Sequence, residues 1–297
     1  MTGGHTETSG ITDRGRPIHG ATPPGQAVPC RRETPLTADE LNAVVEAIAL
    51  GREERRSVAL PVELQTRDWQ SVTAVALRLD ERLGWEPAGW KIGAASEEVR
   101  RSEGLPGPAP GRIYTGTVFE SPARLPGSLF INYRNVECEF AFRLGADLSP
   151  RETPYSEEEV AASIDCLMPT LELGDTVFED WYGASGYFGS CLDNGGGAAL
   201  VTGTPIRDWR GLDLPGARIE LRLNGRFVKE GFGRAAMGHP LTSLTWLVNW
   251  LGEHGRVLEA GEIVSTGTCT GHCFVAAGDE VSVAFDGAGL VEALFEP

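Results

Sequence analysis

The stretch Val136-Glu137-Cys138-Glu139-Phe140-Ala141-Phe142 alternates apolar side chains with charged or small ones. Side chains of a β-strand point alternately to its two faces, so this pattern predicts a strand with Glu137 and Glu139 together on one face. The opposite face, which carries Phe140 and Phe142, is expected to be buried. Two neighbouring carboxylates repel each other, and a cation between them is one way to relieve the repulsion. The strand is therefore a candidate metal-binding element.

Short β-rich segments separated by Gly, Pro and Asn continue from about residue 113 to the C-terminus. They cover 136–144, 169–173, 198–202, 218–223, 263–266 and 281–285. Two helices interrupt them. A capping box of Ser156 and Glu159 predicts a helix over 160–167, and Pro240 opens a second helix that is closed by Gly255. Many strands with few helices predict a β-dominated α+β body rather than a doubly wound sheet.

The N-terminal part of the chain has a different texture. Residues 1–35 are rich in Gly, Thr, Pro and charged residues and have almost no large apolar side chains, which predicts a disordered tail. Helical patterns follow over 37–51, where a capping box opens the helix, and over 69–84. We therefore divide the chain into this tail, a small helical or mixed unit over 36–112, and a metal-binding catalytic body over 113–297.

Charge and composition limit the partners. Acidic residues outnumber basic ones by 42 to 26, which gives a formal net charge of -16. Phosphate binding needs a concentrated cationic surface, so nucleic acid is excluded as a partner. The chain has no apolar stretch of membrane-spanning length and no basic-then-apolar secretory signal, so we expect no membrane partner and a cytoplasmic location. Its six cysteines are expected to be reduced thiols.

A third acid, Glu172, lies in an apolar β-rich run, where an unpaired charge would be costly. With Glu137 and Glu139 it provides an all-oxygen ligand set, which suits Mg²⁺ or Mn²⁺ better than zinc. Two alternatives remain open at this point. The two strand glutamates could face solvent, and Glu172 could pair with an arginine such as Arg134 or Arg143.

Other chemistry-bearing residues have plainer interpretations. Cys269, His272 and Cys273 allow a zinc hypothesis, which we do not favour because no fourth ligand is spaced nearby. His239, at a helix start, is interpreted as a helix cap. The run 181–189 is either a packed loop or a mobile pocket wall. Three further acids are interpreted as turn residues or as supports of the metal ligands: Asp175, Asp180 and Asp193.

A series of short motifs resembles the fumarylacetoacetate hydrolase superfamily, in particular its 2-keto-4-pentenoate hydratase and 4-oxalocrotonate decarboxylase branch. Order and spacing match over roughly residues 89 to 297. The motifs are Gly89-Trp90-Lys91-Ile92-Gly93, Glu137-Cys138-Glu139-Phe140-Ala141-Phe142, Leu171-Glu172-Leu173, Asp193-Asn194-Gly195, Gly238-His239-Pro240-Leu241, Trp246-Leu247 and Gly261-Glu262-Ile263-Val264-Ser265-Thr266-Gly267-Thr268.

The resemblance implies a C-terminal mixed β-roll that holds Mg²⁺ or Mn²⁺ through Glu137, Glu139 and Glu172. It also implies that Lys91 projects into the same pocket as an acid–base or substrate-orienting group. Substrates of this branch are small 2-oxo acids or 2-hydroxydienoates, and its members are commonly homo-oligomers. We assign three further positions to substrate binding: Gly196, Thr266 and Arg134.

Two departures from the family pattern affect the choice of substrate. After Asp193 and Asn194 the branch usually carries serines that contact substrate, whereas this chain has three glycines over 195–197. The loop after Lys91 usually contains an acidic residue, but residues 104–111 of this chain contain none.

Lys91 is the best candidate for moving a proton in this site. A 2-oxo acid can chelate a metal ion, and the ion then stabilises the enolate formed by proton loss. A nearby cation and partial desolvation predict a lowered pKa for Lys91. The leading function is a metal-dependent lyase of the hydratase or decarboxylase type. The alternatives are a C–C bond hydrolase of acylpyruvate-like substrates and a non-catalytic paralogue that serves as a partner subunit.

Overall fold

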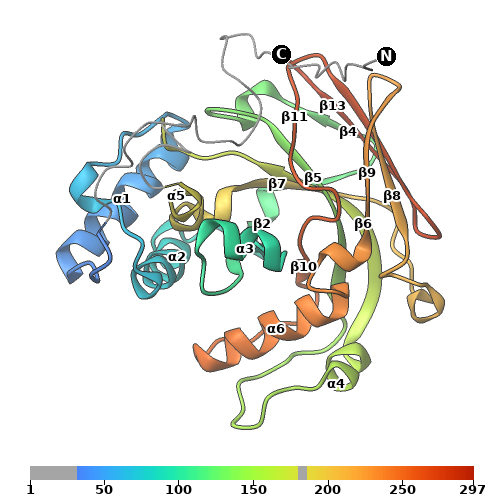
Figure 1. The fold of residues 1–297 in the computed structure, drawn as a ribbon, viewed down its shortest axis with the longest axis horizontal. Helices are drawn as coiled ribbons and strands as arrows, with labels where there is room; N and C mark the ends of the chain where they lie inside the picture. Colours follow the sequence, from blue (N-terminus) through green and yellow to red (C-terminus); the bar gives the residue numbers. More distant parts are fainter. Residues whose placement is uncertain (1–31, 180–185) are drawn as a thin grey trace, which may run out of the picture. The chain divides into compact units, whose positions relative to one another are not determined.

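Residues 32–179 and 186–297 are described by the computed structural model, and Figure 1 shows their arrangement. The helices are α1 (Ala38–Glu54), α2 (Trp69–Leu83), α3 (Glu97–Glu103), α4 (Glu157–Ala162), α5 (Tyr187–Leu192) and α6 (Pro240–Glu253). The predicted tail falls mostly outside the described residues, as do Asp180 and the first part of the run 181–189.

The strands form two sheets. The first is 8-stranded and has the order β2 (Ala109–Tyr114), β1 (Pro87–Gly93), β10 (Ile263–Ser265), β5 (Asn135–Leu144), β6 (Ile164–Gly174), β7 (Gly197–Thr202) and β3 (Val118–Glu120), with β11 (Cys273–Phe274) also paired to β5. The second is 5-stranded and has the order β4 (Ala123–Leu125), β13 (Gly289–Phe295), β12 (Glu280–Phe285), β8 (Arg218–Leu223) and β9 (Arg226–Phe232). These mixed sheets with few helices confirm the predicted α+β class.

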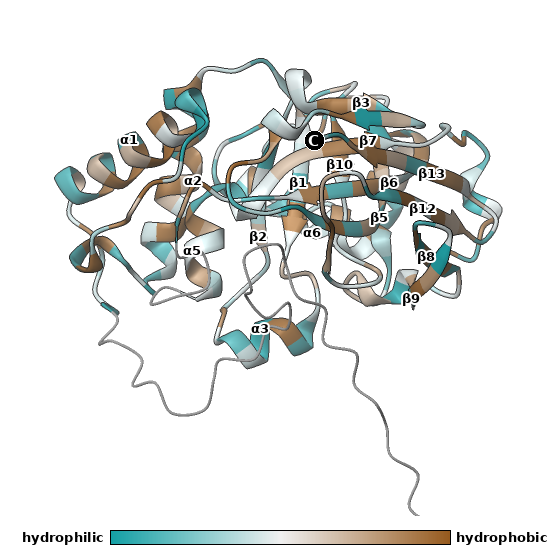
Figure 2. Cartoon of the chain, turned by 90° about the horizontal axis from the view of Figure 1, so that it is seen from above, coloured by the Kyte–Doolittle hydropathy of each residue, from teal (hydrophilic) through white to brown (hydrophobic). Residues whose placement is uncertain are grey.

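The apolar face of β5 packs against the second sheet and α6. Phe140 meets Phe285 of β12 with ring centroids 5.3 Å apart, and Leu244 and Leu247 of α6 join the same core. Figure 2 shows the apolar residues along the strands that enclose this core. Because successive side chains alternate, the other face of β5 is free to carry polar groups.

A second apolar cluster joins α1, α2 and α5 (Figure 1). The capping box of Thr37 and Glu40 that predicts α1 is present, as is that of Ser156 and Glu159 before α4. β1 and β2, from the range assigned to the N-terminal unit, pair into the 8-stranded sheet through β10. The division of the ordered chain near residue 113 stays a prediction.

Two predicted helix ends are wrong for identifiable reasons. The helix predicted over 160–167 ends at Ala162, because the following residues pair with β5, where Cys166 is opposite Arg143. The first helix continues past Gly51 to Glu54. A Cβ at Gly51 would lie 2.8 Å from Val58 Cγ2, so this glycine permits close packing instead of ending the helix.

Across residues 32–179 and 186–297, no helix is both long and apolar enough to cross a membrane.

Candidate active site

Strand register places the three predicted metal ligands on one face of the 8-stranded sheet. Glu137 of β5 is directly opposite Glu172 of β6, and Glu139 follows two residues later on the same face. Side chains opposite each other in antiparallel strands have Cβ atoms about 5 Å apart. Glu139 and Glu172 are buried, with exposed fractions of 1% and 5%. The alternative of a solvated strand face is therefore wrong.

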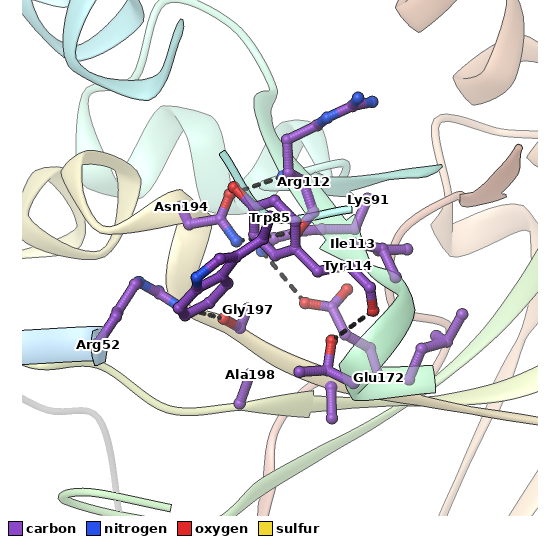
Figure 3. Close-up of a pocket in the computed structure, with 13 residues that line it drawn as sticks. Arg52, Trp85, Lys91, Arg112, Ile113, Tyr114, Glu172, Asn194, Gly197 and Ala198 are labelled. Atoms are coloured by element: carbon purple, nitrogen blue, oxygen red, sulfur yellow. Dashed lines mark hydrogen bonds and ion pairs between the residues drawn. The ribbon is translucent and has the colours of Figure 1, made fainter. Parts of the chain in front are cut away.

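Lys91 reaches this same face from β1. Lys91 is in register with Ser265 of β10, and Ser265 is in register with Ala141 of β5, whose side chain points the same way as that of Glu139. The Lys91 side chain is buried. Its Nζ is 3.2 Å from Glu172 Oε1 (Figure 3). The same Nζ donates a hydrogen bond to the Gly195 carbonyl oxygen. Glu172 thus pairs with a lysine and not with either of the arginines considered.

Glycines enclose the side chain of Lys91. A Cβ at Gly195 would lie 2.7 Å from Lys91 Nζ, and a Cβ at Gly111 would lie 2.9 Å from Lys91 Cε. A Cβ at Gly197 would come within 3.4 Å of the same Cε atom. The glycine run that replaces the family's serines therefore provides the room in which the lysine lies.

The Gly195→Ala variant is expected to displace Lys91 and lose activity. The added Cβ would clash with Nζ, and the residue has a φ of +61°, a conformation that costs a non-glycine residue about 1–3 kcal/mol. Gly225→Ala is the matched control, because its φ is +75° but nothing lies within 4 Å of the added Cβ. Thermal unfolding and steady-state kinetics separate the two effects. Equal loss of activity in both variants would contradict the enclosure of Lys91 as the cause.

Hydrogen bonds that sequence reasoning missed orient Glu139. Its Oε2 accepts from Ser265 Oγ at 2.7 Å and from the Gly267 backbone N–H at 2.8 Å. Such partners fix a metal-ligating carboxylate in place. Ser265 and Gly267 lie within the motif 261–268, but a pairing across 126 residues leaves no local signal in the sequence.

Glu137 is oriented by a second missed pair. Its Oε1 accepts from Asn135 Nδ2 at 2.8 Å and lies 3.0 Å from Nδ1 of the half-exposed His272. The Asn135 amide is itself oriented by the Cys273 backbone N–H, which donates to Asn135 Oδ1 at 3.1 Å. His272 is therefore a neighbour of the carboxylate cluster, a role that the zinc hypothesis did not include.

The pKa values of the three carboxylates diverge. Burial acts to raise the pKa of Glu137, but His272, Lys91 and hydrogen bonds outweigh it and lower this pKa to about 2. Burial, followed by repulsion from the other two carboxylates, raises the pKa of Glu139 well above its ordinary value. Burial also raises the pKa of Glu172, although Lys91 opposes this shift. A hydrogen bond with Glu139 also acts to lower the pKa of Glu172, but burial outweighs it.

The donor set fits a divalent cation in its chemistry. Three carboxylates face one ammonium group, so when ionised the cluster carries an excess of buried negative charge that a cation would neutralise. As the side chains stand, no three His, Cys, Asp or Glu residues of the described chain are grouped closely enough to hold a metal ion. Each carboxylate is instead turned to a protein partner.

The lowered pKa predicted for Lys91 refers to a lysine beside a metal cation, and it stays a prediction. Burial does act to lower it, but the negative charges of Glu172, Glu137 and Glu139 together raise the pKa of Lys91 above its ordinary value. Beside these three carboxylates, Lys91 is therefore a charged ammonium group at neutral pH.

Arg134 and Arg143 have other neighbours. The Arg134 guanidinium lies over the ring of Phe130, 5.3 Å from its centroid, and its Nε is buried without a hydrogen-bond partner among the described residues. Arg143 pairs with Asp165 at 2.7 Å. No ion pair described in residues 32–179 and 186–297 joins Arg134 to the three glutamates.

Gly196 and Thr266 lie beside residues of the cluster. Gly196 follows Gly195, the acceptor for Lys91, and has a φ of 74°. Thr266 lies between the two residues that hold Glu139, but its Oγ1 donates to the Phe140 carbonyl oxygen at 2.8 Å. The Thr266 hydroxyl is therefore committed to the backbone of β5.

The other residues singled out in the sequence have structural roles. His239 caps α6, as predicted, by accepting the Leu241 backbone N–H at 2.9 Å. Asp175 accepts the backbone N–H groups of Ile131, Asn132 and Tyr133, and burial raises its pKa to about 6. The cysteines in the described chain are buried and free: Cys138, Cys166, Cys191, Cys269 and Cys273.

Comparison with known proteins identifies the family of this site. Residues 114–295 match the model of the fumarylacetoacetate (FAA) hydrolase C-terminal domain. The chain belongs to the fumarylacetoacetate hydrolase family. The resemblance inferred from the motifs is therefore confirmed, and so is the fold class with its small helical N-terminal region.

The related family members are hydratases and decarboxylases. A 2-keto-4-pentenoate hydratase of Paraburkholderia xenovorans is 29% identical over 79% of this chain and 85% of that protein. A 2-keto-4-pentenoate hydratase of Dechloromonas aromatica is 30% identical over 78% of this chain and 82% of that protein. The structure of 4-oxalocrotonate decarboxylase from Pseudomonas putida, complexed with magnesium and adipate, superposes with a TM-score of 0.78 at 26% identity, over 89% of this chain and 100% of that chain.

A narrow crevice in the described chain reaches Lys91 and Glu172. Lys91 and Glu172 form part of its wall, and Arg52 of α1 and Asn194 form another part (Figure 3). Trp85 and Tyr114, which meet edge to face at 5.2 Å, also line it. The N-terminal helices thus contribute directly to the surroundings of Lys91.

Proposed function

We propose that this protein is a divalent-metal-dependent lyase that hydrates or decarboxylates a small 2-oxo acid or 2-hydroxydienoate. The observation that carries the proposal is the cluster of Glu137, Glu139 and Glu172 on one sheet face, with the buried ammonium of Lys91 beside it. The hydratase and decarboxylase relatives support this reaction type.

Mg²⁺ or Mn²⁺ held by the three glutamates would supply Lewis-acid polarisation of a substrate carbonyl. The all-oxygen donor set favours these hard cations over zinc. Ser265, Gly267 and Asn135 would keep the carboxylates oriented toward the ion, because each of them holds a ligand through a hydrogen bond in this structure.

Lys91 would hold and deliver the proton. Its ammonium is 3.2 Å from Glu172 and is shielded from water, so its charge acts at short range on an anionic substrate. Delivery of a proton to a substrate carbon completes hydration or decarboxylation, and the neutral amine can then recover a proton from solvent or substrate. Arg134, whose Nε has no hydrogen-bond partner among the described residues, is proposed as a substrate-binding residue together with Gly196 and Thr266.

Titration calorimetry of Mg²⁺ and Mn²⁺ with oxalate, a chelating mimic of a 2-oxo acid enolate, tests the site. The native protein is expected to bind oxalate only when metal is present, and Glu139→Ala is expected to abolish this binding. A native protein that binds neither metal would contradict the proposal and favour a non-catalytic partner subunit, whose copurification with an active protein can then be examined.

Turnover distinguishes the lyase from its hydrolase alternative. We expect dienoates or 4-oxalocrotonate-like acids to be consumed with addition of water or release of CO₂. Release of pyruvate and a second acid from an acylpyruvate would instead assign a C–C bond hydrolase. Sedimentation velocity tests the homo-oligomer proposed from the family pattern.

A further inference from the structure

The position of the Lys91 ammonium depends on a short loop between α5 and β7. This loop, residues 193–197, contains the Gly195 carbonyl oxygen that accepts the Lys91 Nζ hydrogen bond. Residues 194–196 form a 3₁₀ turn, in which the Gly196 backbone N–H donates to the Asp193 carbonyl oxygen at 2.8 Å. Fixing three consecutive glycines in such a turn costs more conformational entropy than fixing other residues, so contacts from the surrounding protein help to hold the loop in place.

Arg52, in the last turn of α1, binds both ends of the 193–197 loop, and Figure 3 shows its contact with Gly197. Its Nε donates to Asp193 Oδ1 at 2.6 Å, and one terminal nitrogen donates to the Asp193 carbonyl oxygen at 3.1 Å. The other terminal nitrogen donates to the Gly197 carbonyl oxygen at 3.1 Å. The side chains of Arg52 and Asp193 are 11% and 0% exposed, so this ion pair is largely shielded from water.

Other contacts fix single points of the loop. Asp193 Oδ2 accepts from Thr176 Oγ1 at 2.7 Å and from the Val177 backbone N–H at 2.8 Å. The Asn194 amide accepts from the Arg112 backbone N–H at 2.6 Å and donates to the Arg112 carbonyl oxygen at 2.9 Å. Backbone hydrogen bonds join Asp193 to Gly196 and Asn194 to Gly197. Among the side-chain contacts of the described chain, that of Arg52 connects Asp193, the first residue of the loop, with Gly197, the last.

Arg52 has little capacity left for a substrate. A guanidinium has five N–H donors in a fixed fork. Nε and one terminal nitrogen are directed at Asp193, and the other terminal nitrogen is directed at Gly197. Bidentate, charge-assisted pairs of this kind contribute geometry as well as energy. The arrangement therefore suits the fixing of a loop better than the capture of a substrate carboxylate.

We propose that Arg52 is a positioning residue for Lys91: its guanidinium fixes the 193–197 loop, and the Gly195 carbonyl of that loop fixes the ammonium. The inference rests on the proposed role of Lys91 in proton transfer. Through Arg52 the N-terminal helical unit takes part in placing the catalytic lysine, although α1 supplies none of the proposed metal ligands.

The test compares Arg52→Met with Arg56→Met. Arg56 lies at the same end of α1, pairs with Glu54 on the surface and makes no described contact with the loop, so it is a control for loss of one positive charge. Lys91 and Lys229 are the only lysines of the chain. In a Lys229→Arg background, [ε-¹³C]lysine therefore gives one NMR signal, which reports on Lys91 alone.

A fixed lysine side chain shows two inequivalent Hε protons, whereas rotamer averaging makes them equivalent. We expect inequivalent Hε protons in the native protein and in Arg56→Met, and averaged or broadened signals in Arg52→Met. With a 2-oxo acid that the native protein converts, the kcat of Arg52→Met is expected to fall by about 100-fold, because a small misplacement of a catalytic group lowers a rate by about this factor. Mn²⁺-dependent oxalate binding, which measures the carboxylates, is expected to be unchanged.

Unchanged Lys91 signals and unchanged kcat in folded Arg52→Met would overturn the inference. If Arg52→Met fails a thermal-unfolding check, Arg52→Lys decides on the same readouts, because it keeps the charge but cannot reach Asp193 and Gly197 together. The NMR comparison needs no substrate. If the native protein turned over no 2-oxo acid, the proposed function would be contradicted. The NMR signals of Lys91 would still test whether Arg52 positions this lysine.

Discussion

Glu139→Gln is expected to abolish metal binding and turnover while making the metal-free protein more stable. The glutamine oxygen can still accept from Ser265 and Gly267, so the local structure is kept. The negative charge that a divalent cation needs is removed. Removing only a hydrogen-bond partner of a metal ligand weakens metal affinity by about 10–100-fold. Removing a ligand itself is therefore expected to weaken metal affinity by more than this.

The gain in stability follows from the electrostatics of the metal-free site. Burial and the neighbouring carboxylates raise the pKa of Glu139 well above its ordinary value, so ionised Glu139 destabilises the metal-free fold at neutral pH. The fold becomes more stable as the pH falls through the raised pKa of Glu139, because the carboxyl group is then neutral. The amide of the Glu139→Gln variant is neutral at every pH. The metal-free variant should therefore unfold at a higher temperature than the native protein near neutral pH.

Calorimetry with Mn²⁺ and oxalate, together with thermal unfolding with and without Mn²⁺, measures both effects. Mn²⁺ should raise the unfolding temperature of the native protein but not that of the variant, since ligands stabilise only the state they bind. Glu292→Gln, on the exposed side of β13, is the control and should behave like the native protein. A Glu139→Gln protein with normal metal affinity would remove Glu139 from the ligand set.

Lys91→Met is expected to remove turnover but to spare metal binding. Loss of a positioned proton donor typically lowers a rate by about 10²–10⁴-fold. Methionine has a similar length and no charge, so it fits among the surrounding glycines. Removal of the ammonium also removes a cation that competes for Glu172, so Mn²⁺ affinity should be retained or increased.

The same substitution destabilises the metal-free protein. Loss of one partner of a buried ion pair leaves an uncompensated charge and costs about 3–5 kcal/mol, and bound Mn²⁺ should restore part of this loss by neutralising Glu172. Lys229→Arg replaces the other lysine of the chain and keeps its charge, which makes it the control. Steady-state kinetics and denaturant unfolding with and without Mn²⁺ provide the data. Full activity in Lys91→Met would end the assignment of Lys91 as the proton donor.

Local patterns predicted the central strand and the helix starts. The alternation over residues 136–142 identifies both the buried face of β5 and the face with Glu137 and Glu139, because a strand places every second side chain on the same side. The capping box of Thr37 and Glu40 locates the start of α1 within one residue of the observed helix. The place of Lys91 near the glutamates was predicted from the family resemblance and not from a local pattern.

Features that depend on pairing between distant segments were not predictable in the same way. The start of β6 reads as a helical continuation of α4, and only its pairing with β5 makes it a strand. The sequence offers no hint that Glu137 meets His272, because the two lie far apart in the chain and meet only after β11 has paired with β5. The effect of the three carboxylates on the pKa of Lys91 was not predictable for a related reason, because only strand register brings them near the lysine.

The site is assembled from segments that are remote along the chain, which bears on how the protein folds. Lys91 meets Gly195 across 104 residues, and Glu139 meets Ser265 across 126 residues. Long-range pairings form slowly, because loop-closure entropy is lost before the contacts form. An unfolded or half-folded chain has no cluster of carboxylates to offer a cation. The proposed metal ion is therefore not expected to nucleate folding, and we expect it to slow unfolding instead of speeding up refolding.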